Sequence, residues 1–259
     1  MRRLLLLLII WAGPAFFAIA RPSIHPPVDN GQLSENLRID SKILDYALQY
    51  RVYLPPGYTQ VSGLPVVYVA DGQWYISEGQ MPALLDDLIS AKTIMPVIAV
   101  FIDNRDPDNL KNNRRNSQFL CNDKYVEFVT RELVPFIDSN YKTKKNADAR
   151  MMLGLSFGGL NAAQFALKAN DVFQLIAMQS PAMHPCPAIY TGFQNSEVLP
   201  LKIYMSTGSA NDTEVGTRKL KKILDEKGYN IKYQEVNRGH NWKNWRPLLD
   251  DILIYFFST

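Results

Sequence analysis

Short apolar runs alternate with segments of helical periodicity along most of the chain. The runs have the length of strands, and runs that are apolar on both faces are typical of central strands in a parallel sheet. They lie at residues 46–54, 65–70, 95–102, 150–155, 175–178, 203–205 and 231–236. Apolar residues recur at helical spacing in residues 79–90, 123–138, 157–169, 215–228 and 244–256. The alternation predicts an α/β fold with a mainly parallel sheet that is covered by helices on both sides.

Residues 1–20 have a different pattern. They begin with two arginines after the first methionine, continue from Leu4 without any charge, and end in a small-x-small sequence at Ala20. These features are typical of a secretory signal peptide that is cleaved after Ala20. The alternative is a transmembrane anchor, but the apolar stretch is at the short limit for a bilayer of about 30 Å, and Pro14 interrupts it.

Residues 21–43 are rich in proline and polar side chains, so we expect an extended N-terminal arm there. Residues 44–259 contain no internal repeat, heptad run or linker, and we expect them to form a single domain. They also contain no second apolar run long enough to span a membrane. We therefore expect an exported protein, periplasmic or secreted, without a stable membrane anchor once the signal peptide is removed.

Composition narrows the class of protein. Apolar residues make up 47% of the 259 residues and charged residues 20%, which is enough apolar surface to exclude disorder as a description of the whole chain. The formal net charge of +3 is too small for the concentrated basic face of a nucleic-acid-binding protein. Two cysteines exclude both a scaffold built from disulfides and a cysteine-rich metal site.

A candidate nucleophile lies in Gly154-Leu155-Ser156-Phe157-Gly158, between a predicted strand and a predicted helix. In that context G-x-S-x-G indicates the nucleophile elbow of α/β-hydrolases, a strained turn that projects the serine hydroxyl out of the sheet. The start of the following helix offers N–H groups and a positive dipole to a developing oxyanion. The alternative interpretation is a glycine-rich turn that happens to contain Ser156.

A serine nucleophile needs a base, and the chain has three histidines. The triad of this fold runs along the chain in the order serine, acid, histidine, which favours His240 because it follows the last β run. His25 lies in the proline-rich arm before Ser156. His184 comes before any strand end that carries an acid, so we expect it to be a pocket-wall or surface residue.

The acid should lie between Ser156 and His240, in the loop that follows the strand at residues 203–205. Asp212 is the first candidate for holding the imidazole tautomer, and Glu214 is the second. Asp212 could instead only cap the helix that follows it.

An oxyanion hole in this fold takes one N–H from the residue after the nucleophile, here Phe157. The second N–H comes from a loop after an early strand, which indicates Gln73, because Gly72 permits a close approach of the backbone. The alternative is that Asp71-Gly72 forms a plain turn.

Together these residues resemble the putative esterase family, which includes enterochelin esterases, esterase D-like enzymes, secreted feruloyl esterases and mycolyltransferases. The resemblance covers roughly residues 42–256. The motifs that carry it are Val52-Tyr53-Leu54-Pro55-Pro56-Gly57-Tyr58, Asp71-Gly72-Gln73, Glu132-Leu133-Val134-Pro135-Phe136-Ile137 with Tyr141, Gly154-Leu155-Ser156-Phe157-Gly158-Gly159-Leu160, and Gly239-His240-Asn241-Trp242-Lys243-Asn244-Trp245-Arg246.

The resemblance implies an α/β-hydrolase fold and hydrolysis of a small-molecule ester, with no metal and no organic cofactor. By position, Ser156 matches the family's nucleophile and His240 its base. Gln73 and Phe157 match the residues whose backbone amides form the oxyanion hole, and the segment around Asp212 resembles the acid-bearing segment of the feruloyl esterase branch.

The segment from Arg115 to Asn122 resembles one in the enterochelin esterases, where the arginine lies near the substrate. The chain departs from that branch at Gln118, where the branch has a glutamate. Loops after strand ends form the ligand crevice in such sheets, so we expect Arg115 to bind anionic or phenolic groups of the substrate. The alternative is that Arg114 and Arg115 form a solvated pair in a loop.

The sequence therefore predicts an exported serine carboxylic-ester hydrolase that acts on a siderophore lactone or on an aryl or acyl ester. An acyltransferase or a non-catalytic binding protein on the same fold remains the alternative. Cys121 and Cys186 lie in segments that could form walls of one pocket, where they could pair in an oxidising compartment or remain two buried thiols.

Overall fold

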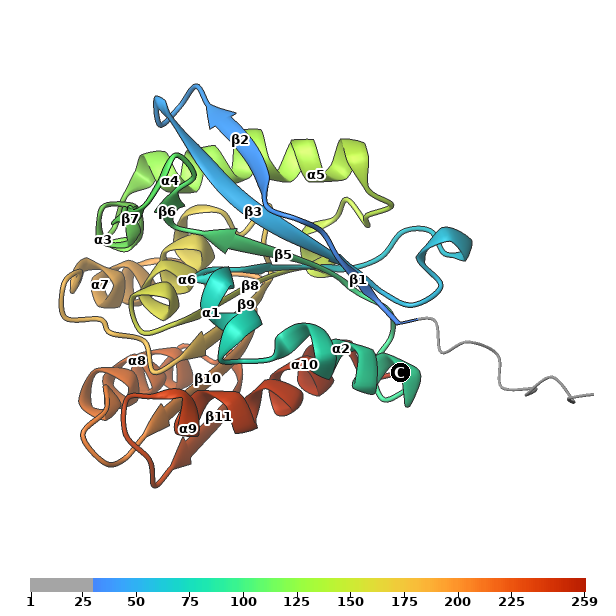
Figure 1. Ribbon diagram of the computed structural model, residues 1–259. Coiled ribbons are helices and arrows are strands. Elements are labelled where there is room, and N and C mark those ends of the chain that lie inside the picture. Colours follow the sequence, from blue (N-terminus) through green and yellow to red (C-terminus); the bar gives the residue numbers. More distant parts are fainter. Residues whose placement is uncertain (1–29) are drawn as a thin grey trace, which may run out of the picture.

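The computed structural model describes residues 30–259 (Figure 1). The predicted signal peptide and residues 21–29 of the predicted arm lie outside the described residues. Within residues 30–259, no helix has the length and apolar character needed to cross a membrane.

Nine of the strands in the described part of the chain form one mixed sheet in the order β1-β3-β5-β4-β8-β9-β10-β11, and β2 also pairs with β3. The strands of this sheet are β1 (Gln32–Leu33), β2 (Leu37–Ser41), β3 (Tyr46–Leu54), β4 (Val66–Val69), β5 (Ile98–Asp103), β8 (Arg150–Leu155), β9 (Leu175–Gln179), β10 (Lys202–Gly208) and β11 (Asn230–Val236). From β5 across to β11 every pairing is parallel, whereas β1, β2 and β5 pair antiparallel with β3. The prediction of a mainly parallel sheet is therefore confirmed.

Helices and short turns connect these strands (Figure 1). The helices are α1 (Gly72–Ser77), α2 (Met81–Ser90), α3 (Arg115–Phe119), α4 (Asp123–Phe128), α5 (Val134–Asn140), α6 (Phe157–Lys168), α7 (Ala188–Asn195), α8 (Glu214–Glu226), α9 (Trp242–Trp245) and α10 (Leu249–Phe257). A π-helical turn spans Val129–Leu133, and 3₁₀ turns span Tyr58–Gln60, Ala147–Ala149 and Arg246–Leu248. A separate hairpin consists of β6 (Arg105–Asp106) and β7 (Asn109–Asn113).

The core has two layers, one on each face of the sheet. Side chains alternate between the faces along each central strand: in β4, Val66 and Tyr68 belong to one apolar cluster, and Val67 and Val69 to the other. Helices α4 to α8 pack over the first cluster, and α1, α2 and α10 pack over the second (Figure 1). Because both faces are covered, the central strands appear in the sequence as continuous apolar runs.

The helix expected at residues 123–138 is present, but it is not a regular α-helix throughout. Pro135 has no N–H to donate to the carbonyl four residues earlier, and the backbone widens into the π-helical turn just before this proline. The helix expected at residues 244–256 is likewise divided, because Pro247 lies in the 3₁₀ turn between α9 and α10.

The predicted start of the domain at residue 44 is too late. Strands β1 and β2 lie inside the predicted arm and pair with β3, so they belong to the main sheet. In β2, Leu37, Ile39 and Ser41 are less exposed than Arg38 and Asp40 between them. Alternation with a period of two is typical of a half-buried strand. The prediction of an extended arm did not take this alternation into account.

A disulfide joins Cys121 to Cys186, with their Cα atoms 6.3 Å apart. The pairing considered from the sequence is therefore present in the structure. It ties the loop after α3 to the loop before α7, two segments that lie 65 residues apart in the chain.

Removing this disulfide should lower the free energy of unfolding by about 2–4 kcal/mol, because it releases a long closed loop in the unfolded chain. Urea unfolding of the oxidised protein, the reduced protein and the Cys121→Ser, Cys186→Ser double variant measures the loss. The reduced protein and the variant should agree. Two titratable thiols in unfolded protein that was never reduced would show that the bond does not form.

Candidate active site

Ser156 lies at a strained turn between β8 and α6. Its backbone has φ 55° and ψ −118°, outside the regions that a serine ordinarily adopts. A Cβ at Gly154 would come within 2.2 Å of the carbonyl oxygen of Gly158, and one at Gly158 would come within 3.1 Å of the Asp71 carboxylate. The glycines of the G-x-S-x-G motif therefore allow the close approach that the turn requires.

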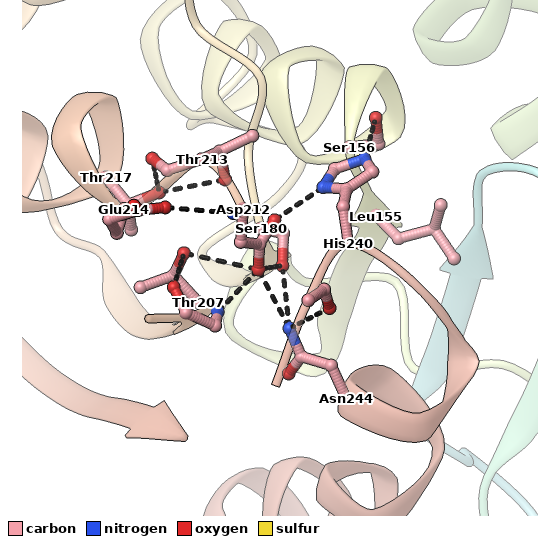
Figure 2. Close-up of polar contacts among 12 residues, drawn as sticks. Leu155, Ser156, Ser180, Thr207, Asp212, Thr213, Glu214, Thr217, His240 and Asn244 are labelled. Atoms are coloured by element: carbon pink, nitrogen blue, oxygen red, sulfur yellow. Dashed lines mark hydrogen bonds and ion pairs between the residues drawn. The ribbon is translucent and has the colours of Figure 1, made fainter. Parts of the chain in front are cut away.

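His240 and Asp212 meet Ser156 at the carboxyl ends of the strands (Figure 2). The Nε2 atom of His240 lies 2.9 Å from the Ser156 hydroxyl oxygen, and its Nδ1 atom lies 2.5 Å from the Oδ1 atom of Asp212. These three residues follow β8, β10 and β11, so parallel strands bring their loops to one edge of the sheet. The structure thus brings together the three side chains that the sequence predicted.

The partners of His240 determine its hydrogen-bonding roles. An ionised Asp212 can only accept a hydrogen bond, so Nδ1 of His240 carries a proton and donates it. The neutral imidazole then has a lone pair at Nε2, which accepts the hydroxyl proton of Ser156. This arrangement can withdraw a proton from Ser156 during attack on an electrophile.

The side chain of Asp212 has no exposed surface. Burial by itself raises the pKa of this carboxyl. Hydrogen bonds from His240, from Ser180 and from the backbone N–H groups of Gly208 and Thr213 outweigh burial and lower the pKa of Asp212 to about 2. Asp212 is therefore an anion at neutral pH.

Glu214, the second candidate for the acid, accepts a hydrogen bond of 3.0 Å from the backbone N–H of Asp212 and makes none to His240. It steadies the loop that presents Asp212. The alternative of Asp212 as a helix cap also fails, because α8 begins at Glu214 with Thr213 as its N-cap.

The two residues expected at an oxyanion hole begin neighbouring helices. Phe157 is the first residue of α6, and Gln73 is the second residue of α1. These helices follow β8 and β4, which are adjacent strands. A Cβ at Gly72 would lie 2.4 Å from the carbonyl carbon of Phe101, so the glycine lets α1 begin directly against β5. The first N–H groups of a helix have no acceptor within it, so the backbone N–H groups of Phe157 and Gln73 are not used by α6 and α1.

Arg115 has a role that the sequence did not indicate. Its Nε and Nη2 atoms lie 2.7 and 2.8 Å from the two carboxylate oxygens of Asp71, which is fully buried, and Nη2 also lies 3.3 Å from the carbonyl oxygen of Leu155. Within residues 30–259, only Nη1 of this guanidinium has no hydrogen-bond partner. Arg115 thus fixes the turn that carries Asp71 against the end of β8, directly before Ser156.

Arg114 lies away from this site. Its guanidinium forms an ion pair of 2.5 Å with Asp106 and donates a hydrogen bond of 3.0 Å to the carbonyl oxygen of Ala47. It also stacks over the ring of Tyr46. The alternative of a solvated arginine pair is therefore wrong for both residues.

A cavity of about 420 Å³ opens in front of Ser156 and His240. Its other walls are Trp74, Glu78, Arg115, Leu155, Trp242 and Trp245. The sequence did not predict the tryptophans as site residues, although Trp242 and Trp245 lie within five residues after His240. His184 is exposed and its ring lies 5.8 Å from that of Phe157, at the edge of the site.

Comparisons with known proteins agree with this geometry. The model of a family described as putative esterase matches residues 41–256. The protein YjcH of Bacillus subtilis is 28% identical over 240 residues, covering 86% of this chain and 97% of its own. The iron(III) salmochelin esterase of Escherichia coli is 28% identical over 156 residues, which is 59% of this chain but only 36% of that protein.

Among solved structures, the enterobactin esterase of Shigella flexneri, determined in the presence of enterobactin, superposes with a TM-score of 0.77. The alignment covers 86% of this chain and 58% of that one at 22% sequence identity. At this identity the likeness establishes the shared fold.

Replacing Arg115 should damage both the fold and the site. Arg115→Ala leaves the buried Asp71 carboxylate unpaired, so the free energy of unfolding should fall by about 3–5 kcal/mol. Turnover of a neutral short-chain ester should fall as well, because the end of β8, directly before Ser156, loses its hydrogen bond from Arg115. Arg114→Ala is the control and should cost clearly less stability, because Arg114 and Asp106 are both partly exposed.

Urea unfolding and ester hydrolysis measured on both variants test this expectation. A loss confined to anionic substrates, with stability unchanged, would assign Arg115 to substrate binding alone.

Proposed function

The chain belongs to the putative esterase family, and from that premise we propose that it is an exported serine esterase that hydrolyses carboxylic esters through an acyl-enzyme. The continuous set of hydrogen bonds from Asp212 through His240 to Ser156 carries the proposal. The signal-peptide pattern of residues 1–20 supports export.

In the first half of the reaction, Ser156 Oγ attacks the ester carbonyl carbon while its proton moves to Nε2 of His240. Asp212 stabilises the imidazolium that forms. The carbonyl oxygen becomes an oxyanion, which accepts hydrogen bonds from the backbone N–H groups of Phe157 and Gln73. His240 then returns the proton to the departing alkoxide, so an alcohol leaves and the acyl group stays on Ser156.

In the second half, a water molecule replaces the alcohol. His240 takes a proton from the water as its oxygen attacks the acyl carbon, and the same oxyanion hole holds the new intermediate. Collapse of the intermediate returns the proton to Ser156 Oγ and releases the carboxylic acid. The free enzyme is restored with atoms and charge in balance.

The walls of the cavity indicate the kind of substrate. Trp74 and Trp242 are partly exposed and offer apolar faces for aromatic groups, and Nη1 of Arg115 can donate to a phenolate, a catecholate or a carboxylate. An aryl ester or a siderophore lactone with such groups near the scissile bond fits these walls. The relation to the salmochelin esterase supports the siderophore class.

Ser156→Ala and His240→Ala should each lower hydrolysis of a short p-nitrophenyl ester by about four to six orders of magnitude. The double variant should be little worse than either, because the two groups act as one unit. Circular dichroism verifies the fold, and Ser139→Ala, at an exposed position on α5, is the matched control. Near-normal turnover by Ser156→Ala would refute the serine mechanism.

The same assay separates the alternatives. Repeating it with an added alcohol should give mainly the free acid, since water is the proposed acceptor. Mainly transesterified product would identify an acyltransferase, and no turnover by the wild-type protein on any ester would favour a binding protein.

A further inference from the structure

The second carboxylate oxygen of Asp212 faces away from His240 into a group of donors (Figure 2). Oδ2 of Asp212 lies 2.6 Å from the Ser180 hydroxyl, 2.5 Å from the backbone nitrogen of Gly208 and 2.8 Å from Nδ2 of Asn244. The carboxylate is thus held at both oxygens, and only one of them serves His240.

Ser180 lies at the centre of this group and is fully buried. It follows β9, the strand between β8 and β10, so it lies between the loops that carry Ser156 and Asp212. Its backbone has φ 44°, and its N–H donates to the carbonyl of Ser206 at 2.7 Å. A serine with a positive φ is uncommon, so the surrounding structure must hold this turn in place.

The direction of the Ser180 hydroxyl follows from its partners. Nε1 of Trp245 lies 2.8 Å from the Ser180 oxygen, and an indole nitrogen can only donate. Nδ2 of Asn244 lies 3.3 Å from the same oxygen and also only donates. The single hydroxyl proton of Ser180 is therefore left for Asp212, which can only accept.

Helix α9 couples this group to the base. Asn244 and Trp245 belong to α9, which begins two residues after His240, and the rings of Trp245 and His240 meet edge to face with centroids 4.9 Å apart. Gln179 donates to the carbonyl of Trp245 at 2.8 Å and accepts from the hydroxyl of Tyr75 on α1 at 2.9 Å. The donors to Asp212 are thereby anchored to the helix that carries Gln73.

We propose that Ser180, oriented by Trp245 and Asn244, is a positioning residue that holds Asp212 in the rotamer that meets His240. The inference rests on the proposed serine mechanism and names a residue beyond the triad. Ser180 does not line the substrate cavity, and its one hydroxyl proton goes to Asp212, so it acts on the reaction through Asp212. Its hydroxyl is also among the donors that keep the pKa of Asp212 low.

The first test compares two buried serines, Ser180 just after β9 and Ser206 on the neighbouring strand β10. Ser180→Ala should lower kcat for a short p-nitrophenyl ester by about 10- to 100-fold, the range expected for residues coupled in one hydrogen-bond network. KM should stay within about twofold, because the cavity walls are unchanged. Ser206 is the matched control: it is fully buried on β10, and its hydroxyl has no hydrogen-bond partner within the described residues. Ser206→Ala should keep kcat within about twofold.

The second test separates positioning from a general role in the fold. In an Asp212→Ala background, Ser180→Ala should cause no further loss of kcat, because the group that Ser180 positions is already absent. A loss of the same size in both backgrounds, or equal kcat for Ser180→Ala and wild type, would overturn the proposal.

A third variant covers the case in which Ser180→Ala does not fold. Ser180→Cys keeps a side chain of similar size and replaces the hydroxyl that donates to Asp212 with a thiol, which is only a weak hydrogen-bond donor. It should lower kcat in the wild-type background and leave it unchanged in the Asp212→Ala background. The same loss in both backgrounds would again overturn the proposal.

Measuring Ser156→Ala in parallel distinguishes failure of the serine mechanism from failure of the role proposed for Ser180. If it retains turnover, the serine mechanism fails. If it is inactive while Ser180→Ala matches Ser206→Ala, only the role of Ser180 fails.

Discussion

The buried carboxylate of Asp212 is the constraint on which the site depends. An anion with no exposed surface is tolerated only when donors surround it, and here they come from Ser180 just after β9, from the end of β10, from α9 and from His240. Satisfying this one charge draws the loops after three parallel strands together. The geometry around Ser156 is a consequence of that convergence.

A second buried carboxylate, that of Asp71, supports the turn at Ser156 from the side opposite Asp212. Asp71 has no exposed surface, and Arg115 pairs with both of its carboxylate oxygens. Gly158, in the turn at Ser156, packs close to the carboxylate of Asp71. The Asp71–Arg115 pair therefore links the start of α1 to this turn. The nucleophile is therefore held between two buried anions, one satisfied by the loops that carry the base and one by Arg115.

Local patterns predicted the parts of the molecule that local sequence determines. The apolar runs predicted the central strands. The spacing of the glycines around Ser156, which a strained turn requires, predicted the nucleophile, and the order of the triad along the chain then predicted His240 as the base. Contacts between distant segments left no such pattern: 44 residues separate Asp71 from Arg115, and nothing near either residue indicates the other. Short helices such as α1 and α3 show too little periodicity to be recognised, and the alternation in β2 was hidden among prolines and polar residues.

The most direct test of the account is to isolate the acyl-enzyme. Acid quenching during hydrolysis of a p-nitrophenyl ester, followed by peptide mass spectrometry, locates any covalently bound acyl group. The account predicts one acyl group per chain, on the peptide that contains Ser156, and none in Ser156→Ala. An acyl group on another residue, or rapid turnover with no acyl group on Ser156, would contradict it.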